Sequence, residues 1–161
     1  MELTHGMIVR GRAAIELVEI TPHVGAPEDV QVTFWSTTTM CAGGPVGMTM
    51  RMWQAQERAQ LAQLEVIPAI PWVSFTDAEG KRWYGVLIRE RVETSPEGVA
   101  YSRVRVHGAC EPDEDWRVGR LAKVPYSQVE PLSKAPFPDH FRQLLAKFSG
   151  TWDLGSQAYG C

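Results

Sequence analysis

Cysteine, glycine and the start of a predicted helix lie close together between residues 37 and 53. A thiol becomes a strong nucleophile as the thiolate, and a helix N-terminus or a nearby histidine lowers its pKa. Cys41 is the candidate nucleophile, and His107 is the base that we favour, with Asp113 or Glu114 to orient it. These residues predict one alternative function, a cysteine-dependent hydrolase or acyl transferase.

The glycines that follow Cys41 fit an anion site only in part. A strand, a glycine run and a helix in that order aim backbone N–H groups at a phosphate or carboxylate. Residues 42–47 lack the Lys-Ser/Thr ending of a phosphate loop and the spacing of a dinucleotide fingerprint, and Pro45 removes one donor. We therefore interpret the stretch as a connector from a strand into a helix, with catalysis by Cys41 kept as an alternative.

The three cysteines form no recognisable metal or disulfide pattern. Their number is odd, they are far apart and no two form a Cys-x-x-Cys pair, so we expect reduced thiols. His107 and Cys110 are near enough in sequence to share a metal with Cys41 or Cys161, but their spacing is not diagnostic of a zinc site. We predict neither a metal nor a cofactor, and the sequence assigns no role to Cys110 or Cys161.

Arginine and aromatic residues alternate along two predicted strands and the segment that follows them. Arginine and aromatic side chains together suit phosphate binding with base stacking, or anchoring of an acidic peptide or partner subunit. The same pattern also fits a solvated sheet face whose charges are balanced by Glu90, Glu93 and Glu97. The predicted binding residues are Trp83, Arg89, Arg91, Tyr101, Arg103, Arg105, Trp116, Arg117 and Arg120.

Methionine and tryptophan cluster where the first helix is predicted to begin. Met48, Met52 and Trp53 are the candidates for an apolar pocket, because methionine side chains adapt to irregular apolar ligands. Ordinary core packing explains the same residues. A second alternative function is therefore a binder of small apolar ligands.

The elements that must position these residues follow from hydrophobic periodicity. A period of two predicts strands at residues 7–10, 13–20 and 30–35, and steps of three and four predict a helix over residues 47–64. Residues 66–132 read as short strands joined by tight turns. A stripe of Phe141, Leu144, Leu145 and Phe148 predicts a C-terminal helix that ends near residue 150.

This order of elements predicts an α+β fold. We expect a curved antiparallel sheet or a small SH3-like barrel, with one central and one C-terminal helix. The barrel-like portion is expected at about residues 66–132, within a single domain of residues 1–150 that is followed by a tail of residues 151–161.

Composition and charge narrow the classes of function. The chain has 161 residues, 44% of them hydrophobic and 22% charged, as in globular proteins, and its net charge of −3 disfavours general attraction to polyanions. No apolar run approaches the roughly 20 residues of a membrane span, and the first residues do not resemble a signal peptide, so we predict a cytoplasmic protein without membrane contact.

No complete catalytic set or cofactor fingerprint emerges from the sequence. The prediction is therefore a non-enzymatic binding or assembly module that recognises another macromolecule through the arginine and aromatic residues. A protein partner or self-association is favoured over nucleic acid, because the chain is mildly acidic overall.

Overall fold

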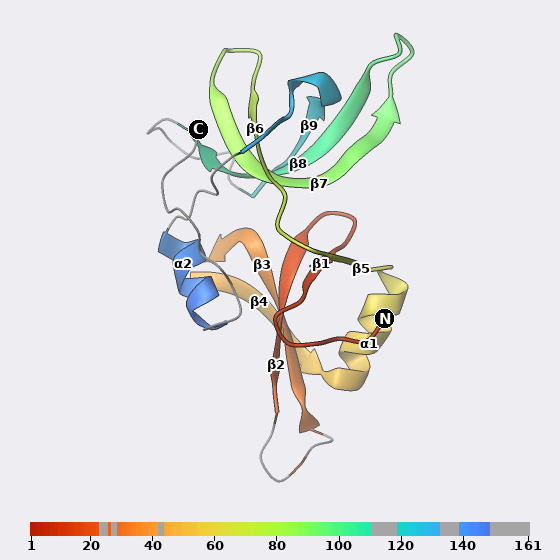
Figure 1. Ribbon diagram of the computed structural model, residues 1–161, viewed down its shortest axis with the longest axis vertical. Helices are drawn as coiled ribbons and strands as arrows, with labels where there is room; N and C mark the ends of the chain where they lie inside the picture. Colours follow the sequence, from red (N-terminus) through yellow and green to blue (C-terminus); the bar gives the residue numbers. More distant parts are fainter. Residues whose placement is uncertain (23–25, 27–28, 42–43, 111–118, 133–138, 149–161) are drawn as a thin grey trace. The chain divides into compact units, whose positions relative to one another are not determined.

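The strands of the computed structural model form two antiparallel sheets (Figure 1), which confirms the predicted α+β class with antiparallel sheet. The structure describes residues 1–22, 26, 29–41, 44–110, 119–132 and 139–148. The elements are β1 (Ile8–Arg10), β2 (Ile15–Thr21), β3 (Gln31–Cys41), β4 (Gly44–Arg51), α1 (Met52–Leu61), β5 (Glu65–Ile67), β6 (Trp72–Thr76), β7 (Arg82–Thr94), β8 (Ala100–Ala109), β9 (Leu121–Pro125), the 3-10 helix η2 (Tyr126–Gln128), β10 (Glu130–Pro131) and α2 (Asp139–Ala146).

The chain divides into two compact units, one around each sheet. The first unit contains Met1–Ala69 together with α2, and the second begins at Ile70 and contains β6 to β10. The barrel-like portion that we predicted at residues 66–132 spans the second unit and also includes part of β5, which belongs to the first sheet. A single domain over residues 1–150 stays a prediction, and the tail of residues 151–161 lies outside the described residues.

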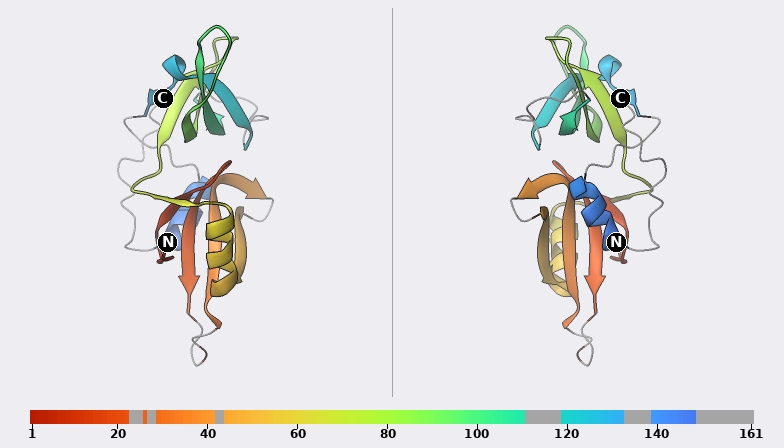
Figure 2. Two further views of the ribbon diagram at one scale, coloured as in Figure 1. Left: turned by 90° about the vertical axis from the view of Figure 1, so that its right-hand side faces the viewer. Right: turned by 90° about the vertical axis from the view of Figure 1, so that its left-hand side faces the viewer.

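The first sheet has the strand order β4-β3-β2-β1-β5 and carries a helix on each face (Figure 2). Opposite residues of antiparallel strands project from the same face, so Val18 and Phe34, which are Cα partners, share one face. That face packs against Ala55 and Ala59 of α1. On the other face α2 contacts β3 and β4, and the Lys147 amine lies 4.3 Å from the centre of the Trp35 ring.

An ion pair fastens α1 to this sheet. Arg58 Nη2 donates to Glu16 Oε1 at 2.7 Å, and the Arg58 guanidinium lies 4.3 Å from the centre of the Phe34 ring. The two side chains are only 25% and 10% exposed. A largely buried charge is stable only when it is paired, so this contact fixes where the helix lies on the strands.

Residues 47–51 are strand, and the predicted helix over residues 47–64 is wrong at its start. They belong to β4, in which Met48 opposes Phe34 and Met50 opposes Val32, and α1 begins only at Met52. Methionine is a good helix former, but pairing with β3 overrides that weak preference. The stretch after Cys41 is therefore not a connector into the helix, since a strand separates the two.

Gly47 has a packing role in this strand. A Cβ added there would lie 2.7 Å from Trp35 Cε3 and 2.8 Å from Thr33 Cγ2. Trp35 is the Cα partner of Gly47 in the β3–β4 ladder. The missing side chain gives the indole ring its space, so this glycine serves packing rather than an anion site.

The second sheet has the order β10-β6-β7-β8-β9, and β7 and β8 bend along their length (Figure 1). One face carries the core, formed by Val73, Phe75, Trp83, Val104, Val106 and Val124. The β6–β7 turn is organised by Asp77, whose Oδ1 accepts the N–H groups of Glu79 and Lys81 and whose Oδ2 accepts Trp83 Nε1, each at 2.9 Å. This turn fixes the first hairpin of the sheet.

The second sheet stays open among the described residues. β9 pairs only with β8, and β10 pairs only with β6, at Val73 and Ser74. Three register shifts interrupt the β7–β8 ladder, and such bulges increase local bending. Of the two architectures that we predicted, the curved antiparallel sheet is present and the closed barrel is not.

Candidate functional site

The predicted binding residues do not all lie on one surface. Trp83 is 1% exposed and belongs to the core, so it offers no platform to a partner. Trp116 and Arg117 lie outside the described residues, and Arg120 is exposed just before β9. The remaining members are on β7 and β8.

Three cations stand in line across three strands of the second sheet. Arg89 on β7 is the Cα partner of Arg103 on β8, and Arg103 is the Cα partner of Lys123 on β9. Directly opposite residues of antiparallel strands project from the same face, and like charges in that arrangement destabilise a sheet. We call Arg89, Arg103 and Lys123 the basic row. The sequence predicted Arg89 and Arg103 as binding residues on two strands but did not indicate Lys123.

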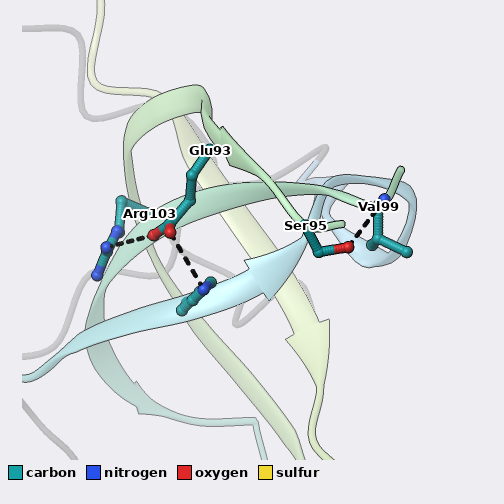
Figure 3. Close-up of polar contacts among 5 residues, drawn as sticks. Glu93, Ser95, Val99 and Arg103 are labelled. Atoms are coloured by element: carbon teal, nitrogen blue, oxygen red, sulfur yellow. Dashed lines mark hydrogen bonds and ion pairs between the residues drawn. The ribbon is translucent and has the colours of Figure 1, made fainter. Parts of the chain in front are cut away.

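One carboxylate lies against the basic row. Glu93 Oε1 accepts from Arg103 Nη2 at 2.6 Å, and Glu93 Oε2 lies 3.3 Å from Lys123 Nζ (Figure 3). The hydrogen bond and charge of Lys123, and then the charge and hydrogen bond of Arg103, hold the pKa of Glu93 below its ordinary value of 4.5. In the part of the chain that the structure describes, Arg89 forms no ion pair. Glu93 therefore pairs with two of the three cations of the row.

Two tyrosine rings beside the basic row each have a cationic side chain over one face. The Lys123 amine lies 4.5 Å from the centre of the Tyr101 ring, and the Arg91 guanidinium lies 4.3 Å from that of Tyr126. Tyr126 in turn donates its hydroxyl to Glu90 Oε1 at 2.9 Å. Arg91 follows Arg89 within an irregular stretch of the β7–β8 ladder. It therefore holds η2 through Tyr126 rather than extending the basic row.

Arg105 serves the structure of the sheet. Its Nη1 donates to the Gly119 carbonyl at 2.6 Å, and burial lowers the pKa of its guanidinium from the ordinary value. The β7–β8 turn beyond the row is closed by the Val99 N–H, which donates to Ser95 Oγ at 3.2 Å (Figure 3). Of the four arginines predicted on the two strands, Arg89 and Arg103 are thus the two that stand in the basic row, while Arg91 is exposed beside Tyr126.

A cavity of about 440 Å³ adjoins the end of the basic row at Lys123. Its walls are residues 75–78 of β6 and the following turn, and residues 122–125 of β9, with Gln128 of η2. The strands on its two sides are not neighbours in the sheet order. We call it the edge cavity, because it lies between two strands that do not pair with each other.

The residues of the enzymatic alternative belong to different units. Cys41 ends β3, and His107 lies in β8, where it is 2% exposed with its ring 5.1 Å from Trp72 and 5.5 Å from Tyr84. Asp113 and Glu114, the expected orienting groups, lie outside the described residues. The structure thus surrounds His107 with aromatic rings, and catalysis by Cys41 stays a prediction.

Cys110 is disulfide-bonded, so the expectation of reduced thiols is wrong for this residue. Sequence spacing missed the bond because no local pattern marks it. A disulfide removes the thiolate that a metal or a nucleophilic reaction requires. In the described residues, no three His, Cys, Asp or Glu side chains group in a way that could hold a metal ion.

The methionine and tryptophan candidates are spread over a strand and a helix. Met48, on β4, is 50% exposed and Trp53, in the first turn of α1, is 60% exposed. Met52 packs against the core of the first unit. Two of the three side chains thus face solvent in the structure, and binding of an apolar ligand there stays a prediction.

Comparison with known proteins finds no matching family model, no matching curated protein and no matching solved structure. Among the described residues, no helix is long and apolar enough to span a membrane. Functional inference therefore rests on the chemistry of the basic row and the edge cavity.

Proposed function

We propose that the second unit is a non-enzymatic binding module, an open SH3-like sheet that recognises an acidic segment of a protein partner through the basic row. The observation that carries the proposal is the alignment of Arg89, Arg103 and Lys123 across three strands with a single carboxylate against them. Such an arrangement lowers the stability of the sheet. An anionic ligand that adds carboxylates relieves that repulsion.

Glu93 is an internal example of the ligand chemistry. Its carboxylate accepts from a guanidinium and an ammonium at once, and both lower its pKa. Charge-assisted hydrogen bonds of this kind are stronger than those between neutral groups. Arg89, at the other end of the row, is exposed and offers a planar donor set that matches a second carboxylate.

The surroundings of the row favour a carboxylate ligand over nucleic acid. Binding of single-stranded nucleic acid relies on open aromatic faces for base stacking. Here Trp83 is buried, and the rings of Tyr101 and Tyr126 each carry a cation of the same chain. The net charge of −3 also lacks the general positive field of nucleic-acid binders.

Fluorescence anisotropy with a labelled decaglutamate peptide tests the proposal. Reversing both Arg89→Glu and Arg103→Glu should weaken binding at least about ten-fold, the effect of 1.4 kcal/mol of lost interaction. Arg12→Glu is a control for a single reversal such as Arg89→Glu, because Arg12 is an exposed arginine of the first unit. Its effect should stay within about two-fold, because Arg12 is not part of the basic row and an exposed charge is screened by salt.

Two results would overturn the proposal. The first is unchanged decaglutamate affinity after the double reversal. The second is tighter binding of a ten-nucleotide oligothymidylate than of decaglutamate at the same salt concentration, since this would assign the row to nucleic acid.

A further inference from the structure

The outer edge of β9 presents main-chain groups that pair with no described strand. Val106 N–H donates to the Arg120 carbonyl, and hydrogen-bonded pairs alternate along an antiparallel ladder. Because every second residue of β9 bonds to β8, Ala122 and Val124 direct their main-chain groups toward β8, as Arg120 does. Leu121 and Lys123 therefore direct their N–H and C=O groups toward the open edge.

β6 presents a similar free position on the opposite wall of the edge cavity. Leu87 N–H donates to the Pro71 carbonyl and Asp77 N–H to the Lys81 carbonyl, so odd-numbered residues of β6 bond to β7. Thr76 consequently directs its main chain to the other edge. β10 pairs only with Val73 and Ser74, so Thr76 has no strand partner in the described structure.

The edge cavity between these two edges is large enough for side chains of a ligand. Its volume of about 440 Å³ lies within the roughly 300–1,000 Å³ of ligand pockets. Phe75, Ala78, Ala122 and Val124 give it apolar walls. The carboxylate of Asp77, which also lines it, already accepts three N–H groups of its own hairpin.

We infer that the open edge of β9 binds an extended peptide as an added strand, in which acidic residues alternate with apolar residues. The inference rests on the proposed function and deepens it.

In the added strand, the residue opposite Lys123 projects from the same face as Lys123 and brings an acidic side chain to the basic row. The neighbours of that residue lie opposite Ala122 and Val124 and direct apolar side chains into the edge cavity. Main-chain hydrogen bonds then supply affinity, and the alternation supplies specificity.

Charge excludes a second copy of β9 as the added strand. β9 runs from Leu121 to Pro125 with Lys123 at its centre. Pairing it with its own copy brings two basic rows together, and the Glu93 of each copy is already engaged by its own Arg103 and Lys123. Like charges on facing strands destabilise a sheet. A heterologous acidic strand has the complementary charge instead.

Two peptides of equal composition test the alternation by fluorescence anisotropy with the full chain. One alternates glutamate and valine, and the other carries the same glutamates and valines in two blocks. The alternating peptide should bind at least about ten-fold more tightly, because only it satisfies the row and the cavity together. N-methylation of its glutamate amides should remove this advantage, because those amides face β9.

A substitution in the cavity wall gives an independent readout. Ala78→Trp places a large ring at the exposed rim of the edge cavity, and Glu79→Trp, which does not line the cavity, is its matched control. We expect Ala78→Trp to weaken the alternating peptide about ten-fold and to leave decaglutamate unchanged. The control should change neither affinity by more than about two-fold.

The outcomes separate this inference from the proposed function. If the two peptides bind with equal affinity and Ala78→Trp has no effect, the inference of an added strand is wrong. The proposed function is still supported in that case if reversal of Arg89 and Arg103 weakens binding of both peptides. If that reversal leaves every peptide unchanged, the proposed function fails. The added strand is then retained only if the alternating peptide remains sensitive to Ala78→Trp.

Discussion

Glu93 Oε1 accepts a hydrogen bond from Arg103 Nη2 at 2.6 Å, across the turn that joins β7 and β8. The same carboxylate lies 3.3 Å from Lys123 on the neighbouring strand. One exposed glutamate therefore links two of the three cations of the basic row. Its protonation and its removal each have a measurable consequence.

Acid should remove the contribution of Glu93 to stability. Because its pKa is lowered in the folded chain, the contribution is present above the ordinary value of 4.5 and is lost as the pH falls through the folded value. The difference in urea midpoint between the native chain and Glu93→Gln should be positive at neutral pH and vanish once the pH is well below the folded pKa of Glu93. High salt should shrink it at neutral pH. A difference that persists at low pH would contradict this account.

Removing the same carboxylate should improve binding of an acidic ligand. Glu93→Gln keeps the shape of the side chain but frees Arg103 and Lys123 from their internal anion. We expect decaglutamate to bind more tightly by about two- to five-fold, a small change because exposed ion pairs contribute little. Anisotropy titrations of the two chains measure this. Weaker binding by the variant would show that Glu93 orders the row for its ligand.

Asp77→Ala should destabilise the second unit. It leaves the indole N–H of Trp83 without its acceptor and removes the two hydrogen bonds that fix the β6–β7 turn. A buried donor left unpaired costs about 1–3 kcal/mol, and Trp83 is 1% exposed. Urea unfolding followed by tryptophan fluorescence measures the loss. Glu79→Ala, in the same turn, is the control and should change stability by less than about 0.5 kcal/mol.

Glu16 and Arg58 should show strong coupling in a double-mutant cycle. Glu16→Gln leaves a guanidinium that is 25% exposed without its anion and should cost about 1–3 kcal/mol of unfolding free energy. Replacing both, as Glu16→Gln with Arg58→Met, should cost less than the sum of the single changes, because no unpaired charge remains. If the losses of unfolding free energy are additive, the coupling energy is zero and the ion pair does not stabilise the fold.

Local periodicity predicted the fold class but missed β4, because its residues were assigned to a connector and to the start of the helix. Met48, Met50 and Met52 are two residues apart, which fits a strand, yet Met48, Met52 and Ala55 also fit the steps of a helix. The choice depends on the β3 partner, where Val32 and Phe34 face Met50 and Met48. Such long-range pairing is not contained in the local pattern, so the helix was extended by five residues.

The sequence predicted the residues of the candidate site only where side chains alternate regularly between the two faces of a strand. Arg89 and Arg103 follow from strand patterning, but Lys123 joins them only through the register of a third strand. Trp83 lies on the core side with its Cα partner Phe75, and its indole N–H donates to Asp77 across the hairpin. Bulges in β7 give Arg91 a different neighbour from the one that simple alternation predicts. Registers and bulges are properties of paired strands, and a single sequence does not display them.

The return of α2 to the first unit has a consequence for biosynthesis. The ribosome makes β1 to β5 first and α2 only after β6 to β10, so the strands of the second sheet emerge while the first sheet still lacks one of its helices. Leu144 and Leu145 of α2 are buried in the finished chain. Until they arrive, the nascent first sheet has an uncovered apolar face. All strands of the second sheet are therefore synthesised before the first unit has its last element.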